Sequence, residues 1–84
     1  PDKHAIMYYL QGEQEWRVCT FTTRGEILSD FSTGLPGVGD YMGDINYTGG
    51  LVYFTYYPDG SGYNEEYYCV DARPGKSHAI QRTR

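Results

Sequence analysis

The sequence predicts an all-β domain, and three features of the chain support that prediction. Short β-branched and aromatic runs recur along the 84 residues, and Gly or Pro separates them. No window of about a dozen residues has the i, i+3, i+4 apolar spacing of an amphipathic helix. We therefore expect six to seven short antiparallel strands. They would form either a small sandwich or barrel, or two propeller-like meanders.

The expected strands follow one another with short connections. In chain order they cover residues 5–10, 16–21, 27–31, 44–47, 51–57, 63–70 and 78–81. A hairpin turn is expected at 23–26, a loop at 34–39, a Gly-Gly turn at 49–50, and Pro-Gly turns at 58–62 and 73–75. Alternation in the second strand separates two faces, with Trp16, Val18 and Thr20 on one and Arg17, Cys19 and Phe21 on the other.

The length of the chain predicts a single small domain with limited core. Such a domain commonly needs a covalent link, a metal or a partner for stability. Cys19 and Cys69 lie 50 residues apart in apolar surroundings, and neither belongs to a CxxC metal pair. We expect a disulfide between them, which would stabilise the domain by about 4 kcal/mol. Two buried free thiols are the alternative.

Three further features bear on the compartment. A disulfide indicates a secreted protein. The sequon Asn46-Tyr47-Thr48 agrees with secretion and makes Asn46 a candidate glycosylation site. No apolar run approaches the length of a membrane span. We therefore expect a secreted protein without a membrane span.

The net charge of −4 is unevenly distributed. Residues 1–71 carry a balance of −8, whereas residues 73–84 carry four cations and no acid. A basic tail of this kind either lies on its own acidic domain or reaches an anionic partner. An acidic body repels a phosphate backbone, so we expect no nucleic-acid binding.

The chain is self-similar at a spacing near 37 residues. Pro1, Pro36 and Pro74 begin similar segments, and each is followed by related strand and turn patterns. Units 1–35 and 36–73 would each be one antiparallel meander, with residues 74–84 as a basic tail of a single domain spanning 1–84.

Two stretches resemble the blades of fungal and bacterial fucose-binding lectins that are built as small-bladed β-propellers. They are Trp16-Arg17-Val18-Cys19 with Gly25-Glu26-Ile27, and Leu51-Val52-Tyr53-Phe54 with Glu66-Tyr67-Tyr68-Cys69-Val70-Asp71. The resemblance implies sugar binding by an Arg, a Glu and an aromatic side chain, in an oligomer that completes the propeller. The pattern is incomplete, because Ser29 replaces the Glu of the first unit and Val52 replaces the Arg of the second.

The size of the chain and its early-to-late cysteine pair also resemble the small secreted effectors of plant-pathogenic fungi with a six-stranded MAX-type sandwich. That resemblance implies a monomer that binds a host protein. The cysteine spacing of 50 is longer than the spacing usual in that group.

Side chains suited to catalysis are few. His4 and His78 occupy corresponding places in the repeat, without a Ser/His/Asp or Cys/His arrangement. Candidate carboxylate pairs are Glu65-Glu66 and Asp40/Asp44. Residues 59–65 alternate oxygen ligands as a calcium loop does but lack its distal Glu. We expect no enzyme activity, no metal and no cofactor.

Side chains suited to binding are plentiful, with ten Tyr, three Phe and one Trp. Aromatic rings stack on the CH face of a sugar, and charged groups hold its hydroxyls. The same residues form protein interfaces. We therefore predict a non-enzymatic binding protein whose partner is a glycan or a host protein. Trp16, Arg17 and Glu66 would contact the ligand, and Tyr53 and Tyr67 would stack on it.

Overall fold

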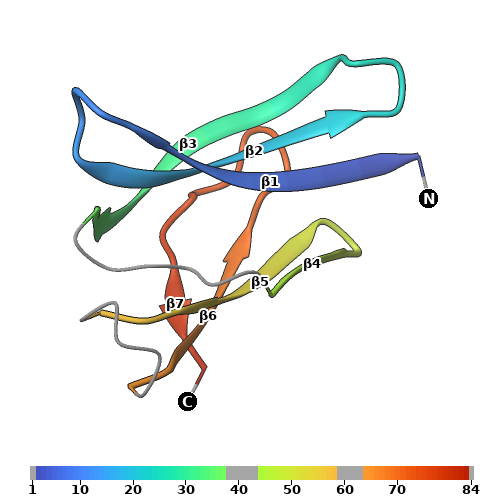
Figure 1. Ribbon diagram of the computed structural model, residues 1–84. Coiled ribbons are helices and arrows are strands. Elements are labelled where there is room, and N and C mark those ends of the chain that lie inside the picture. The colour runs from blue at the N-terminus through green and yellow to red at the C-terminus, as the bar shows by residue number, and fades with distance from the viewer. Residues whose placement is uncertain (1, 38–43, 59–63, 84) are drawn as a thin grey trace.

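The computed structural model describes residues 2–37, 44–58 and 64–83, and these ranges contain seven antiparallel strands and no helix. The all-β prediction is confirmed. One sheet has the order β1-β2-β3 and the other the order β4-β5-β6-β7 (Figure 1). The strands are β1 (Lys3–Leu10), β2 (Glu15–Thr22), β3 (Ile27–Pro36), β4 (Ile45–Thr48), β5 (Leu51–Tyr56), β6 (Glu66–Asp71) and β7 (Gln81–Arg82).

The two sheets form a sandwich around one core (Figure 1). Met7, Val18 and Phe31 form one cross-strand row on the inner face of the first sheet. Burying such apolar side chains between two sheets is the main contribution to stability in a domain of this size. The second sheet contributes the remaining buried apolar side chains, which are Val52, Phe54, Tyr56, Val70 and Ala72.

The connection between β6 and β7 closes the sandwich from one side. In Figure 1 it rises from the second sheet to the level of the first. The ring of His78 stacks on that of Phe31 with centroids 4.1 Å apart, and His78 Nε2 donates to the carbonyl of Arg73. The stacking on Phe31 attaches this segment, which has little regular structure, to the first sheet, and the bond to Arg73 closes the connection on itself.

Strand β3 is longer than the sequence predicts, because it continues through the expected loop to Pro36. Gly34 takes a φ of +78°, which costs glycine little. The Ser32 and Thr33 hydroxyls accept hydrogen bonds from the amides of Gly34 and Leu35, and Thr33 also donates to the Trp16 carbonyl. These side-chain bonds replace regular pairing and keep the bent strand attached to β2.

The turn between β4 and β5 consists of Gly49 and Gly50, as the sequence predicts. Both have positive φ, +60° and +85°, which a two-residue turn matching the strand twist requires. The predicted turn at 58–62 lies largely outside the described residues. The predicted loop at 34–39 is wrong for its first three residues, which belong to β3, and residues 38–39 are not described. Within the described ranges, no helix is long and apolar enough to cross a membrane.

The predicted disulfide is wrong, since both cysteines are free. Cys19 lies opposite the exposed Ile6 and Asp30, on the face of β2 that points away from Val18 and the core. Cys69 lies opposite the exposed Tyr53, on the face of β6 that points away from the core. The thiols thus occupy opposite outer faces. Sheets packed face to face are about 10 Å apart, too far for a disulfide.

Candidate functional site

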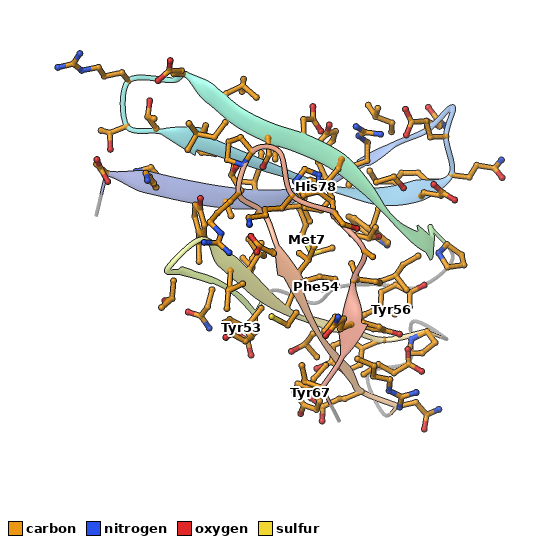
Figure 2. The ribbon with its side chains drawn as sticks, turned by 180° about the vertical axis from the view of Figure 1, so that it is seen from behind. Met7, Tyr53, Phe54, Tyr56, Tyr67 and His78 are labelled. Atoms are coloured by element: carbon orange, nitrogen blue, oxygen red, sulfur yellow. The ribbon has the colours of Figure 1, made fainter. Side chains whose placement is uncertain are left out.

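The outward face of the second sheet is polar and rich in tyrosine. Val52 and Phe54 point into the core, so alternation along β5 directs Tyr53 and Thr55 outward. Cross-strand pairing places Asn46 beside Tyr53 and Tyr67 beside Thr55. Figure 2 shows Tyr53 and Tyr67 on the side of the second sheet that faces away from the first sheet, with Met7 and Phe54 between the sheets.

A groove of about 410 Å³ lies on this face. Thr55, only 7% exposed, is a short side chain between taller neighbours, which lowers the floor of the groove. Asp44 lies next to it, because the Thr55 amide donates to the Asp44 carbonyl at 3.2 Å. The amide of Thr83 is similarly bonded to the carbonyl of Tyr67 at 2.7 Å. The lining residues are Asp44, Asn46, Tyr53, Phe54, Thr55, Tyr67, Tyr68 and Thr83.

A carboxylate fixes the orientation of Tyr67. The phenols of Tyr57 and Tyr67 both donate to Glu65 Oε2, at 3.2 and 3.0 Å. Burial raises the pKa of Tyr57, and the negative charges of Glu65 and Asp44 raise it further. This end of the groove is therefore electronegative, and the raised pKa keeps the Tyr57 phenol protonated at neutral pH.

Of the five residues predicted to contact a ligand, the structure brings only Tyr53 and Tyr67 together. They come from adjacent strands and are diagonal neighbours on one face. Trp16 and Arg17 lie on β2 in the other sheet. The Trp16 ring contacts that of Tyr9, with centroids 5.6 Å apart, and packs against the edge of the core.

The guanidinium of Arg17 is bound by its own neighbours on the outer face of the first sheet. Its Nε donates to the Tyr8 hydroxyl at 3.0 Å, one terminal nitrogen to Glu13 at 2.9 Å, and the other to Asp30 at 3.2 Å. The Tyr8 hydroxyl in turn donates to Asp30. The hydrogen bonds that Arg17 donates to Tyr8 and Glu13 raise its pKa. Arg17 therefore organises a cluster that holds three strands and their turn together.

Glu65 and Glu66 do not form a carboxylate pair, because their carboxylates bind different partners, and Glu65 accepts from Tyr57 and Tyr67. Glu66 accepts a hydrogen bond from the Tyr68 phenol at 2.6 Å and forms an ion pair with Arg82 at 3.4 Å. Burial, followed by the bond to Glu66, raises the pKa of Tyr68 to about 12. Glu66 is thus placed to hold β6 and β7 together rather than to reach the groove beside Tyr53.

The remaining candidates for catalysis or metal binding are either not brought together in the described part of the chain or lie outside it. Asp40 and most of the calcium-like stretch 59–65 lie outside the described residues. Within the part of the chain that is described, no three His, Cys, Asp or Glu side chains gather as metal ligands. His4 contacts Thr23 and the ring of Phe21. His78 has a different partner, the ring of Phe31 at the core.

A second hollow, of about 670 Å³, lies at one open end of the sandwich and includes Lys3, Leu28, Tyr47 and Arg73 in its lining. Arg73 is bound there by both carboxylate oxygens of Asp71, at 2.9 and 2.7 Å. This interaction lowers the pKa of Asp71 to about 2. The basic tail predicted from the sequence therefore makes ion pairs with the domain itself through Arg73 and Arg82.

Six of the eight lining residues were not predicted as ligand contacts, although the sequence had indicated Asp44 as one carboxylate of a pair and Asn46 as a glycosylation site. The six are Asp44, Asn46, Phe54, Thr55, Tyr68 and Thr83. Strand alternation could have identified two of them. Once Val52 and Phe54 are assigned to the core, Asn46 and Thr55 fall on the outward face with Tyr53. Comparison of the chain with protein-family models, with curated proteins and with solved structures found no match.

Proposed function

We propose that the protein is a non-enzymatic carbohydrate-binding protein and that the groove on the outer face of the second sheet is its binding site. The observation that carries this proposal is the position of Tyr53. Its ring is 42% exposed, beside a groove that also presents Tyr67 and several hydrogen-bonding side chains.

These groups match the two requirements of a pyranose. The CH face of the sugar packs against an aromatic ring, and the hydroxyls need donors and acceptors around its rim. Tyr53 supplies the ring, while Asp44, Asn46 and Thr83 supply carboxylate, amide and hydroxyl groups. The sheet holds all of them on regular strands or next to strand ends, so little ordering is needed when a sugar binds.

A glycan array, followed by calorimetry on the best ligand, tests the proposal. We expect Tyr53→Ala to weaken binding by about ten-fold, which corresponds to about 1.4 kcal/mol. Tyr9→Ala is the matched control, because Tyr9 has a similar exposure of 39% but lies in the other sheet. If no sugar binds at millimolar concentration, or if both variants weaken binding equally, the proposal is wrong.

The proposal also concerns the compartment and the state of Asn46. Secretion stays a prediction, because two free thiols remove the argument that a disulfide provided. A glycan on Asn46 would lie in the groove next to Tyr53 and occupy it. Sugar binding therefore requires Asn46 to be unmodified. As a sandwich, the protein is proposed to be a monomer, and light scattering measures this directly.

A second candidate function is binding of a host protein through the outer face of the first sheet. Ile6, Leu10 and Ile27 are exposed on that face, and Ile27 is 60% exposed. Large exposed aliphatic side chains on one face are typical of protein-interaction surfaces. A photo-crosslinking residue at Ile27 would then yield one discrete adduct with a host protein, whereas the same residue at Asn46 would yield none.

A further inference from the structure

Among the described residues, the charged side chains that line the groove or bond to the tyrosines at its end are acidic. Asp44 is the one charged side chain in its lining, and Glu65 lies at its end, bonded to Tyr57 and Tyr67. Among the described residues, no Lys or Arg lines the groove. Arg82, the cation of β7, forms an ion pair with Glu66.

This distribution discriminates between classes of sugar. An acidic or sulfated sugar would bring its negative charge close to Asp44, and the described lining holds no lysine or arginine to neutralise it. A positively charged sugar would gain an ion pair with Asp44. Its cation would also be attracted by the electron-rich faces of the tyrosine rings. A neutral sugar would have only the stacking and hydrogen-bonding contribution.

We propose that the groove selects amino sugars, with the pyranose ring packed on Tyr53 and its ammonium group beside Asp44. This proposal rests on the proposed function, since it names the class of ligand for the same site. The volume of about 410 Å³ is within the range of small-molecule sites. Asn46, directly across from Tyr53, is placed to hydrogen-bond the ring hydroxyls.

A basic peptide is the main competitor, because lysine side chains also carry ammonium groups. A lysine side chain is a flexible chain without a rigid CH face, so it uses the exposed ring of Tyr53 less fully and loses more conformational entropy on binding. The exposed, flat Tyr53 next to hydrogen-bonding side chains favours the sugar.

The test compares two tetrasaccharides that differ in charge, a tetramer of glucosamine and its fully N-acetylated form. Calorimetry is done in low salt at about pH 6, where an amine of this kind is protonated. We expect the glucosamine tetramer to bind about three- to five-fold more tightly, the range of an exposed ion pair, and the preference to disappear at high salt. Asp44→Asn should remove the preference. Glu26→Gln should leave it unchanged, because Glu26 is an exposed acid in the turn between β2 and β3 of the other sheet.

A second measurement does not depend on any substitution in the groove. Cys69 lies beside Tyr53 on the same face, and its side chain is partly exposed. Bound glucosamine tetramer should therefore slow alkylation of Cys69 several-fold, with half-maximal protection at the calorimetric Kd. No protection would contradict binding at this face.

The outcomes separate this proposal from the proposed function. Equal affinity for the two tetrasaccharides would contradict the selection of amino sugars, as would an equal loss of affinity for both in Asp44→Asn. Neither result would contradict carbohydrate binding itself. Binding of neither tetrasaccharide, nor of any sugar on the array, overturns both. If tetralysine binds at least as tightly as the glucosamine tetramer and with the same dependence on Asp44, the ligand is a basic peptide and the proposal is wrong.

Discussion

Cys19 and Cys69 lie on opposite outer faces of the sandwich, with both sheets and the core between their thiols. The domain is therefore held together by packing, hydrogen bonds and ion pairs, without a disulfide. Its stability rests on a small set of completely buried side chains, among them Val18, Val52 and Val70. The stabilisation expected from a covalent link across the domain, about 4 kcal/mol, is absent.

The first prediction concerns the reactivity of these two thiols. Cys69 should react with a thiol reagent much faster than Cys19, which is only 8% exposed and whose thiol has a pKa raised by burial and by Asp30. Time-resolved labelling with mass spectrometry measures both rates, and labelling in denaturant gives the total. A reductant should leave the melting temperature unchanged. Fewer than two reactive thiols in the denatured protein would contradict the structure.

The second prediction concerns Arg17, which the sequence suggested as a ligand contact. Because its guanidinium is bonded to Tyr8, Glu13 and Asp30, Arg17→Ala should lower the free energy of unfolding by about 1 kcal/mol. The affinity for sugar should not change. Chemical denaturation and calorimetry measure the two quantities, with Tyr53→Ala as the converse variant. A loss of affinity in folded Arg17→Ala would place the sugar site on the first sheet instead.

The third prediction concerns alkaline pH. The phenol of Tyr68 has a pKa of about 12 in the folded protein, compared with 10.0 for the free group. Its contribution to stability is complete below pH 10.0 and is lost as the pH rises toward about 12, because the unfolded chain then releases the proton more readily. Chemical denaturation at a series of pH values measures this. Between pH 10 and about 12, the free energy of unfolding should decrease less in Tyr68→Phe than in the unsubstituted protein. Identical pH profiles would exclude this role.

The fourth prediction concerns the turn between β4 and β5. A Cβ at Gly50 would lie 2.6 Å from the side chain of Arg73, and its φ of +85° disfavours any other residue. Gly50→Ala should therefore lower the free energy of unfolding by about 1–2 kcal/mol. Gly12→Ala is the control, because a Cβ there meets nothing within 4 Å. Equal stability of the two variants would show that the turn tolerates a side chain.

The sequence was sufficient to predict the strands, because strand formation depends on local pattern. The run at 51–57 contains the β-branched and aromatic residues that favour β5, and the observed strand is Leu51–Tyr56. The alternation of Val18 with Cys19 also places Cys19 on the outer face. Local pattern thus predicted the faces of the second strand, whereas the last strand was expected at 78–81 and is observed at Gln81–Arg82.

The assembly of the site was beyond local pattern. Which strands share a sheet depends on long-range packing, so Arg17 and Tyr53 could be assigned to a common site although they belong to different sheets. The disulfide prediction failed for a related reason, since apolar neighbours along the chain do not show whether a cysteine faces the core. Considering Val18 and Val70 together as core residues would have directed both cysteines outward.

The bent end of β3 has a consequence for the behaviour of the protein at high concentration. An unpaired strand edge can add a strand from another molecule, which leads to aggregation. From Gly34 to Gly37, however, every backbone amide already has an acceptor. Gly34 donates to the Ser32 hydroxyl, Leu35 to the Thr33 hydroxyl, and Gly37 to the Gln14 carbonyl. Pro36 has no amide hydrogen to donate. This part of the edge has no backbone donor left for a second chain, so intermolecular sheet extension is blocked where β3 leaves the sandwich.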